Sequence, residues 1–261
     1  MGILLRRGFI AVKIAVCIKR VPEMDVKFRI APSGDGVDET GLKFDMSDFD
    51  GYAAEAAIQI KEKVNAGEVV VVCLGPDVVQ ETLRKALSMG ADRAVQLKAD
   101  AVPVDPWAIA EALAAELKTG SFDLVLFGRM SLDVANQSVA PMVAELLGLP
   151  CVTAVSQLDT SGGSIKARRE LEGAAELVEC PLPAVVSSST RTRPGTAARH
   201  AAYDSALRTS PRWRSSRKFP GWETRYGMPR ASQRSSSAMK LCRDRRRSAG
   251  TGEARLMRYE S

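Results

Sequence analysis

Histidines and closely spaced cysteines, which mark many catalytic and metal sites, are missing from residues 1–190. The only histidine is His200, in a basic C-terminal segment, so residues 1–190 cannot form a His-dependent triad or a His-rich metal site. The five cysteines are far apart and include no CxxC pair, which signals neither a zinc site nor a disulfide framework. Cys17 and Cys73 lie in apolar runs and are expected to be buried, unreactive residues. These residues therefore exclude His-dependent catalysis and give no signal of a zinc site in residues 1–190.

Two familiar phosphate-binding motifs are missing from the chain. No GxGxxG follows the first apolar run, and no GxxxxGK(S/T) occurs anywhere. These motifs mark the standard dinucleotide fold and the P-loop NTPases, so neither class is predicted. Any nucleotide must be held by other groups.

Apolar runs of strand length alternate with helical patterns between residues 12 and 189. A helix start is predicted at Ser47 or Asp48, because apolar residues then recur at helical spacing. Residues 25–45 show the loose alternation and turn residues of a peripheral hairpin. The predicted strands span 12–18, 69–74, 94–97, 122–127, 151–158 and 184–187, and the predicted helices span 48 to near 67, 78–89, 106–118 and about 136–147.

This alternation predicts an α/β fold with a mostly parallel, doubly wound sheet and helices on both faces. Ligands of such folds bind beyond the carboxyl ends of the strands. The loops after Ile18, Leu74 and Phe127 are therefore expected to form the site, together with the loop and helix start at 47–50.

Several separate motifs resemble those of electron-transfer flavoprotein β subunits. They are KIAVCIKRVP at 13–22, QETLRKALSMGADR at 80–93, DLVLFG at 123–128, RRELEG at 168–173 and LPAVVS at 182–187. Their order and spacing match the family over residues 12–190, although Ala174 replaces the usual glycine or acidic residue. The resemblance implies the adenine nucleotide α-hydrolase-like fold of these subunits.

The resemblance also implies a heterodimer with an α subunit that carries the redox-active FAD. The β subunit holds AMP, or a second FAD in the bifurcating branch, and docks acyl-CoA or related flavin dehydrogenases. Such a chain is an electron carrier, as in fatty acid β-oxidation, and not an enzyme with its own catalytic groups. No apolar run approaches the roughly 20 residues that span a bilayer. The expected location is the cytoplasm.

Carried over position by position, the nucleotide is expected to contact the ends of three strands and the starts of two helices. The residues are Cys17, Ser47, Asp48, Phe49, Asp50, Leu74, Gly128, Ser131, Asp133, Asn136, Gln137, Ser138 and Val139. Helix starts at Ser47 and near Asn136 offer unpaired N–H groups, and the Ser47 and Ser138 hydroxyls can add donors to a phosphate. Ser47 is equally well explained as a plain N-cap, and Asp133 as a solvated loop residue.

Ser138-Val139-Ala140 departs from the Gln-Val-Gly or Gln-Thr-Gly turn that is usual in the family. Alanine in place of glycine removes backbone freedom and adds a methyl group where the phosphate would approach. Weak AMP binding, or use of another ligand, is the expected consequence. The choice between AMP and FAD stays open.

The two ends of the chain do not fit the family pattern. Residues 1–11 are interpreted as an upstream translation extension, although Arg6 and Arg7 resemble a twin-arginine signal. Residues 190–261 are interpreted as a disordered or frameshifted tail in place of the family's dehydrogenase-docking loop and α-binding arm. Residues 191–261 contain 18 Lys and Arg against 5 Asp and Glu, a net charge of +13, so within a chain of +6 residues 1–190 carry −7.

Two other functions stay open at this point. One is a stand-alone adenine-nucleotide-binding protein of related architecture, although Gly128–Asp133 is not the Gly-rich phosphate loop that such proteins often carry. The other is nucleic-acid binding through basic clusters such as Arg243–Arg247, which predicts steep salt dependence. Disorder explains the tail's composition without any partner, so nucleic acid is not the expected ligand.

Overall fold

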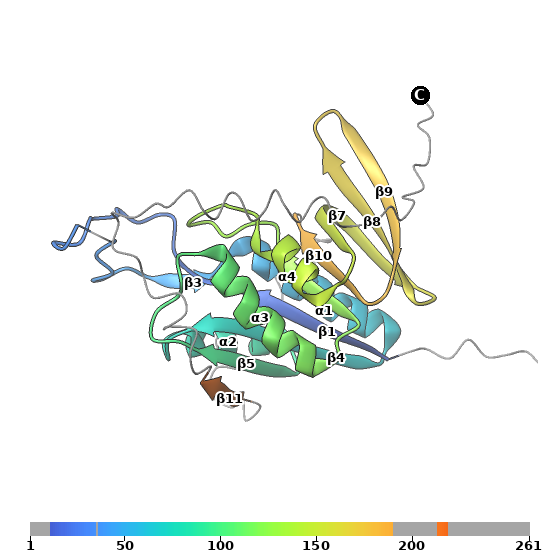
Figure 1. Ribbon diagram of the computed structural model, residues 1–261, viewed down its shortest axis with the longest axis horizontal. Coiled ribbons are helices and arrows are strands. Elements are labelled where there is room, and N and C mark those ends of the chain that lie inside the picture. The colour runs from blue at the N-terminus through green and yellow to red at the C-terminus, as the bar shows by residue number, and fades with distance from the viewer. Residues whose placement is uncertain (1–10, 35, 190–212, 219–261) are drawn as a thin grey trace, which may run out of the picture. The chain divides into compact units, whose positions relative to one another are not determined.

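A computed structural model describes residues 11–34, 36–189 and 213–218 of the protein (Figure 1). Its main feature is a nine-stranded sheet in the order β11-β5-β4-β1-β6-β10-β7-β8-β9. Every neighbouring pair from β11 to β7 is parallel, and only β7-β8 and β8-β9 are antiparallel. The mostly parallel α/β fold predicted from the sequence is thereby confirmed.

The strands of this sheet are β1 (Val12–Ile18), β4 (Gly67–Gly75), β5 (Arg93–Lys98), β6 (Leu124–Gly128), β7 (Cys151–Ser161), β8 (Ser164–Leu171), β9 (Ala174–Pro181), β10 (Ala184–Ser188) and β11 (Trp213–Lys218). A small antiparallel pair joins β2 (Arg20–Pro22) to β3 (Phe44–Met46). Between β2 and β3, Ile30 and Val37 form an antiparallel bridge, which agrees with the predicted hairpin.

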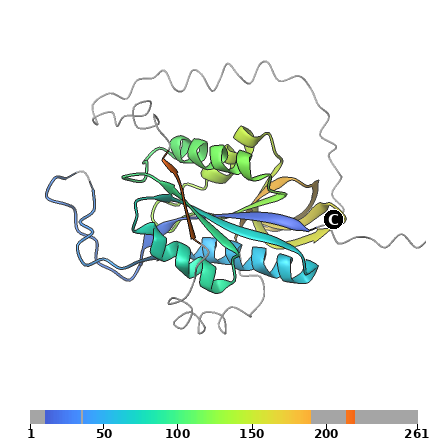
Figure 2. The ribbon, with the colours of Figure 1, turned by 90° about the horizontal axis from the view of Figure 1, so that it is seen from below.

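Helices cover both faces of the sheet (Figure 2). They are α1 (Asp48–Val64) and α2 (Val79–Met89) on one face, and α3 (Pro106–Gly120) and α4 (Val139–Leu147) on the other. In β4, Val69 and Val71 join the apolar cluster under α1 and α2. Val70 and Val72 join the cluster under α3 and α4. A strand covered on both faces must be apolar throughout, which explains the continuous run in the sequence.

The strand order reverses beside β1. The chain places β4 and β5 on one side of β1 and then crosses over to place β6 and β10 on the other side. Ligands of open α/β sheets bind at the carboxyl edge where the order reverses in this way. The fold therefore directs attention to the ends of β1 and β6.

The start of α4 differs from the prediction. The helix begins at Val139 and not near Asn136. Ala135 and Gln137 have φ angles of 49° and 52°, in the left-handed region that a right-handed helix does not include. Asn136 therefore lies in the loop before the helix.

The β8-β9 hairpin was not predicted as a pair of strands. Only one face of β8 is covered, where Ile165 and Ala167 are buried between the polar residues Lys166 and Arg168. β9 is mostly exposed, so apolar content alone does not mark it as a strand. Sequence patterning finds buried parallel strands more readily than such half-covered antiparallel ones.

Within the predicted tail, Trp213–Lys218 forms β11, which pairs in parallel with β5. The rest of that tail lies outside the described residues, with His200, Cys242 and the Arg243–Arg247 cluster. So do residues 1–10 of the predicted extension. The domain boundaries near residues 11 and 189 stay predictions.

Candidate functional site

Three strand ends meet beside the reversal of strand order. Cys17 lies opposite Val72 of β4 and opposite Phe127 of β6. Leu74 follows two residues after Val72, and Gly128 follows directly after Phe127. The structure thus brings the predicted strand-end residues Cys17, Leu74 and Gly128 to one edge of the sheet.

Asp50, in the first turn of α1, joins two of these strand ends. The residue is 6% exposed. Its Oδ2 accepts the N–H of Lys19 at 2.8 Å, and its Oδ1 accepts the N–H of Gly128 at 3.1 Å. Burial raises the pKa of this carboxyl to about 7, although both hydrogen bonds and the charge of Lys19 act in the opposite direction. The carboxylate is therefore directed at the backbone of the protein.

Gly128 is required by the same close approach. A Cβ atom at this position would lie 2.3 Å from Asp50 Oδ1 and 2.7 Å from the Asp50 backbone nitrogen. Both distances are well inside van der Waals contact. Only glycine lets the end of β6 pack this closely against the start of α1.

Ser47 is the N-cap residue of α1, but its hydroxyl is bonded elsewhere. The residue is fully buried, and Ser47 Oγ donates to the carbonyl of Met130 at 3.4 Å. No hydrogen bond from its side chain caps the helix. The hydroxyl expected to serve a phosphate is therefore already engaged, and the first N–H groups of α1 are the donors that this helix start offers.

Lys19 and Asp133 connect the loop after β1 to the loop after β6. Lys19 Nζ lies 2.6 Å from Asp133 Oδ2. Burial acts to raise the pKa of Asp133, but hydrogen bonds from Lys19 and Ser131 outweigh it and the pKa is lowered. Asp133 is thus a charged, paired residue and not a freely solvated one.

Ser138 precedes α4 and carries a buried hydroxyl that lacks a partner. No hydrogen-bond partner for Ser138 Oγ exists among the described residues. Its side chain does not cap the helix either. A buried hydroxyl left unbonded is costly, so this atom is suited to a hydrogen bond with a ligand at the start of α4.

The other predicted residues surround this edge. Asp48 is exposed at the first position of α1, and Phe49 meets Tyr52 edge-on with ring centroids 6.0 Å apart. Asn136 and Gln137 are exposed in the loop before α4, and Val139 is half-buried. Gln137 Oε1 accepts a hydrogen bond from Arg129 Nε at 3.3 Å, which joins this loop to the residue directly after β6.

Ala140, the residue that departs from the family's glycine, belongs to the core. It lies in the first turn of α4, is 6% exposed, and packs in the apolar cluster with Val143 and Ala144. Because its methyl group is covered by protein, its burial gives no support to the expectation that it obstructs a phosphate.

Cys17 and Cys73 are buried thiols close to Asp50. Burial raises the pKa of both, to about 12 for Cys73, and repulsion from Asp50 adds to the effect. Both thiols are therefore neutral near pH 7, as expected for unreactive buried cysteines. Over the described ranges, no group of three or more His, Cys, Asp or Glu could hold a metal ion.

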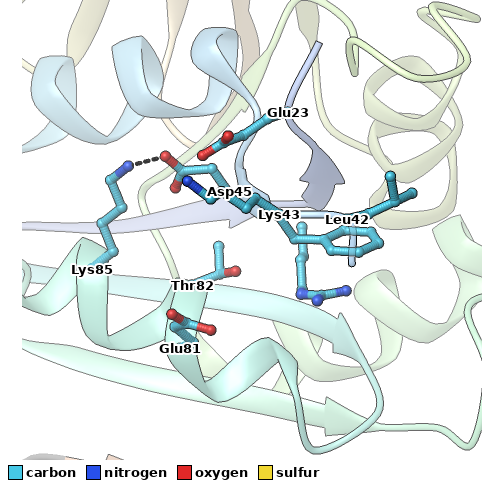
Figure 3. Close-up of a pocket in the computed structure, with 9 residues that line it drawn as sticks. Glu23, Leu42, Lys43, Asp45, Glu81, Thr82 and Lys85 are labelled. Atoms are coloured by element: carbon cyan, nitrogen blue, oxygen red, sulfur yellow. Dashed lines mark hydrogen bonds and ion pairs between the residues drawn. The ribbon is translucent and has the colours of Figure 1, made fainter. Parts of the chain in front are cut away.

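A separate pocket of about 440 Å³ lies between the β2-β3 pair and α2 (Figure 3). Its charged wall residues are Arg20, Lys43, Lys85, Glu23, Asp45 and Glu81. Lys85 pairs with Asp45, and Arg20 stacks on Phe44 at 3.6 Å from the ring centroid. With three cationic and three anionic side chains, the wall of this pocket favours neither an anionic nor a cationic ligand. None of the predicted site residues lines this pocket.

Lys19 and Met130 belong to the candidate site, although sequence reasoning did not single them out. Lys19 directly follows the first strand, and a cation at the carboxyl edge of a sheet was an available signal. Met130 contributes a backbone carbonyl, which no side-chain pattern reveals.

The fold and the site define a doubly wound α/β protein with its candidate ligand site at the reversal of strand order. Comparison with known proteins agrees with this class. The family described as "Electron transfer flavoprotein domain" matches residues 36–206. The electron transfer flavoprotein subunit beta of Homo sapiens is 37% identical over 69% of this chain and 71% of its own length. That of Bradyrhizobium diazoefficiens is 36% identical over 69% of this chain and 72% of its own length.

The chain therefore belongs to the electron transfer flavoprotein family and resembles its β subunits. The family match runs past Ser189, into the segment interpreted as an aberrant tail. None of the described helices is long and apolar enough to cross a membrane.

Proposed function

We propose that this chain is the β subunit of an electron-transfer flavoprotein heterodimer. It binds AMP, or a second FAD, at the carboxyl edge of its sheet. It helps to pass electrons from acyl-CoA or related flavin dehydrogenases through the FAD of an α subunit, in the cytoplasm and in pathways such as fatty acid β-oxidation. The chain contributes binding and orientation, and the flavin supplies the redox chemistry.

The observation that carries this proposal is the Ser138 hydroxyl at the start of α4, which has no hydrogen-bond partner within the described ranges. It lies in the segment that follows β6, where the strand order reverses. A helix start presents N–H groups and a positive dipole end to an anion, and a Ser hydroxyl adds a donor. A nucleotide phosphate fits these groups.

The other contacts follow from the strand ends. The backbone at Cys17 and Leu74 is placed to meet the nucleoside, because both residues lie at the carboxyl edge. Asn136 and Gln137 are exposed polar side chains beside the phosphate position. Asp48 and Phe49 lie at the start of α1, beside Asp50.

The test is to co-express the full chain with an electron transfer flavoprotein α subunit, taken from a neighbouring gene where one is present, and to purify through a tag on this chain. Co-purified α subunit with one FAD and one AMP is the expected result, and two FAD would identify the bifurcating branch. A complex without AMP or a second FAD would contradict the nucleotide role of this chain.

A second sample distinguishes a C-terminus that prevents assembly from a wrong proposal that this chain is a β subunit. It carries the C-terminus usual in the family in place of residues 190–261. If only that sample recovers the α subunit, the tail has disabled assembly. If neither sample recovers it, the heterodimer proposal fails.

A further inference from the structure

Asp50 differs from the other residues of the site because both of its carboxylate oxygens are occupied by the backbone. One oxygen accepts the N–H of Lys19, just after β1, and the other accepts the N–H of Gly128, at the end of β6. These two strands lie on either side of the point where the strand order reverses. The carboxylate thus connects the two backbone segments between which a ligand would bind.

We propose that Asp50 is a positioning residue, which holds these two segments in the arrangement that receives the nucleotide only while its carboxylate is ionised. This inference rests on the nucleotide role proposed above. It assigns Asp50 an indirect role in place of the direct contact expected from the sequence.

The chemistry of the carboxyl group explains the requirement for ionisation. An ionised carboxylate accepts hydrogen bonds at both oxygens, whereas a protonated carboxyl presents a hydroxyl donor at one of them. When Asp50 is protonated, its hydroxyl donor faces one of the two N–H donors, that of Lys19 or that of Gly128. The hydrogen bond from that N–H is lost, and the corresponding segment is released. Burial places this change near neutral pH, since the pKa of Asp50 is about 7.

The charged and titratable groups around Asp50 are Lys19, Asp133, Cys17 and Cys73. Lys19 lowers and Asp133 raises the pKa of Asp50, and these two form an ion pair with each other. The pKa of Asp133 is itself lowered, so it stays ionised. Cys17 and Cys73 are neutral thiols with raised pKa values. Asp50 is therefore the group among these that changes charge near pH 7.

A positioning role and a direct contact predict opposite effects of pH. An ionised carboxylate in contact with a phosphate repels it, so protonation would strengthen binding. A carboxylate that only holds the backbone loses its function on protonation, so binding weakens as the pH falls. The sign of the change separates the two roles.

The experiment measures AMP binding by calorimetry with the full chain at about pH 8 and about pH 6. We expect Asp50→Asn to weaken binding about tenfold at the higher pH, the equivalent of one lost hydrogen bond. Wild-type affinity should fall toward that of Asp50→Asn as the pH is lowered. The comparison uses the ratio of the two affinities, because the phosphate of AMP also titrates and affects both proteins alike.

Asp123→Asn is the matched control. Asp123 accepts the N–H of Lys13 at 2.8 Å, at the opposite end of β1. We expect Asp123→Asn to bind AMP as tightly as wild type at both pH values. An Asp50→Asn protein that binds AMP as tightly as wild type at the higher pH, or wild-type binding that strengthens relative to that of Asp50→Asn as the pH falls, would overturn the proposal.

Amide hydrogen exchange without nucleotide distinguishes failure of this inference from failure of the nucleotide assignment. At one fixed pH, Asp50→Asn should speed exchange in segments 14–22 and 124–132, and Asp123→Asn should not do so there. If wild type binds neither AMP nor FAD, the proposed nucleotide role is wrong. If exchange in those two segments is unchanged by Asp50→Asn, the positioning role is wrong whether or not AMP binds.

Discussion

The two edges of the parallel sheet use carboxylates in different ways. At the amino edge, Asp92 accepts the N–H of Val69 at 2.8 Å and pairs with Lys61. Asp123 accepts the N–H of Lys13 there, also at 2.8 Å. The carboxylates of this edge are half-exposed and have partners within the chain.

The carboxyl edge contains features that oppose stability. Asp50 is a buried carboxylate, Ser138 has a buried hydroxyl without a partner in the described part of the chain, and Ala135 and Gln137 have left-handed backbones. Each of these features costs free energy in the protein alone. The comparison teaches that the amino edge is arranged for stability, whereas the carboxyl edge keeps groups that reduce the stability of the protein alone.

The largest expected difference between the edges is in pH dependence. The pKa of Asp50 is about 7 in the folded protein, against an ordinary value of 3.8. Between these values the folded state keeps a proton that the unfolded state releases, so stability falls as the pH rises. The loss by about pH 8 is on the order of 4 kcal/mol.

Chemical denaturation of wild type and Asp50→Asn between about pH 4.5 and about pH 8 checks this effect. The free energy of unfolding of wild type should fall relative to that of the variant. If the two curves stay parallel, burial does not destabilise the ionised Asp50. Asp123→Asn, at the amino edge, should remain parallel to wild type.

The close approach at the carboxyl edge predicts the next largest effect. Gly128→Val places side-chain atoms where even a Cβ would lie 2.3 Å from Asp50 Oδ1. We expect a loss of about 3 kcal/mol in the free energy of unfolding. Gly51→Ala, one residue after Asp50 in α1, is the control because the new Cβ meets only Met46 Cε at 4.0 Å. It should stabilise the helix by about 0.5–1 kcal/mol, and a matching loss in both variants would contradict the steric argument.

The amino edge predicts a loss of stability without a loss of binding. Asp92→Ala removes the acceptor of the buried Val69 N–H, which should cost about 2 kcal/mol. Lys61→Met removes only the ion pair and should cost under about 1 kcal/mol. Denaturation measures the loss, and calorimetry should find AMP affinity unchanged. Weaker AMP binding by Asp92→Ala would break the distinction between the two edges.

The smallest expected effect has the opposite sign. Ser138→Ala removes a buried hydroxyl that has no partner among the described residues and should stabilise the free protein by about 1 kcal/mol. It should also weaken retention of AMP, because a donor to the ligand is lost. Ser47→Ala, whose hydroxyl bonds to the Met130 carbonyl, should instead destabilise the protein. Thermal denaturation with and without AMP checks both variants. If Ser138→Ala is stabilised and keeps full affinity for AMP, the Ser138 hydroxyl does not contact the ligand.

The sequence predicted the buried parallel strands well because burial on both faces demands a continuous apolar run. Val69–Leu74 and Phe122–Phe127 correspond to β4 and β6 within a few residues. The half-covered strands β8 and β9 were not predicted, because their exposed faces carry charged residues such as Lys166 and Arg168. The start of α4 was misplaced because left-handed residues such as Ala135 leave no clear mark in a sequence.

The amino-acid sequence by itself determined the α/β class, the carboxyl edge as the candidate site, and the family. Apolar periodicity predicts the α/β class and the carboxyl edge, and local motifs indicate the family, because both are patterns of neighbouring residues in the sequence. Only the tertiary structure decided what each site residue does. It turned Asp50 toward the backbone, engaged Ser47 with Met130 and paired Lys19 with Asp133. It left the Ser138 hydroxyl without a partner in the part of the chain that the structure describes. These roles depend on contacts between segments 30 to more than 100 residues apart, whose distances are set by the packing of strands and helices.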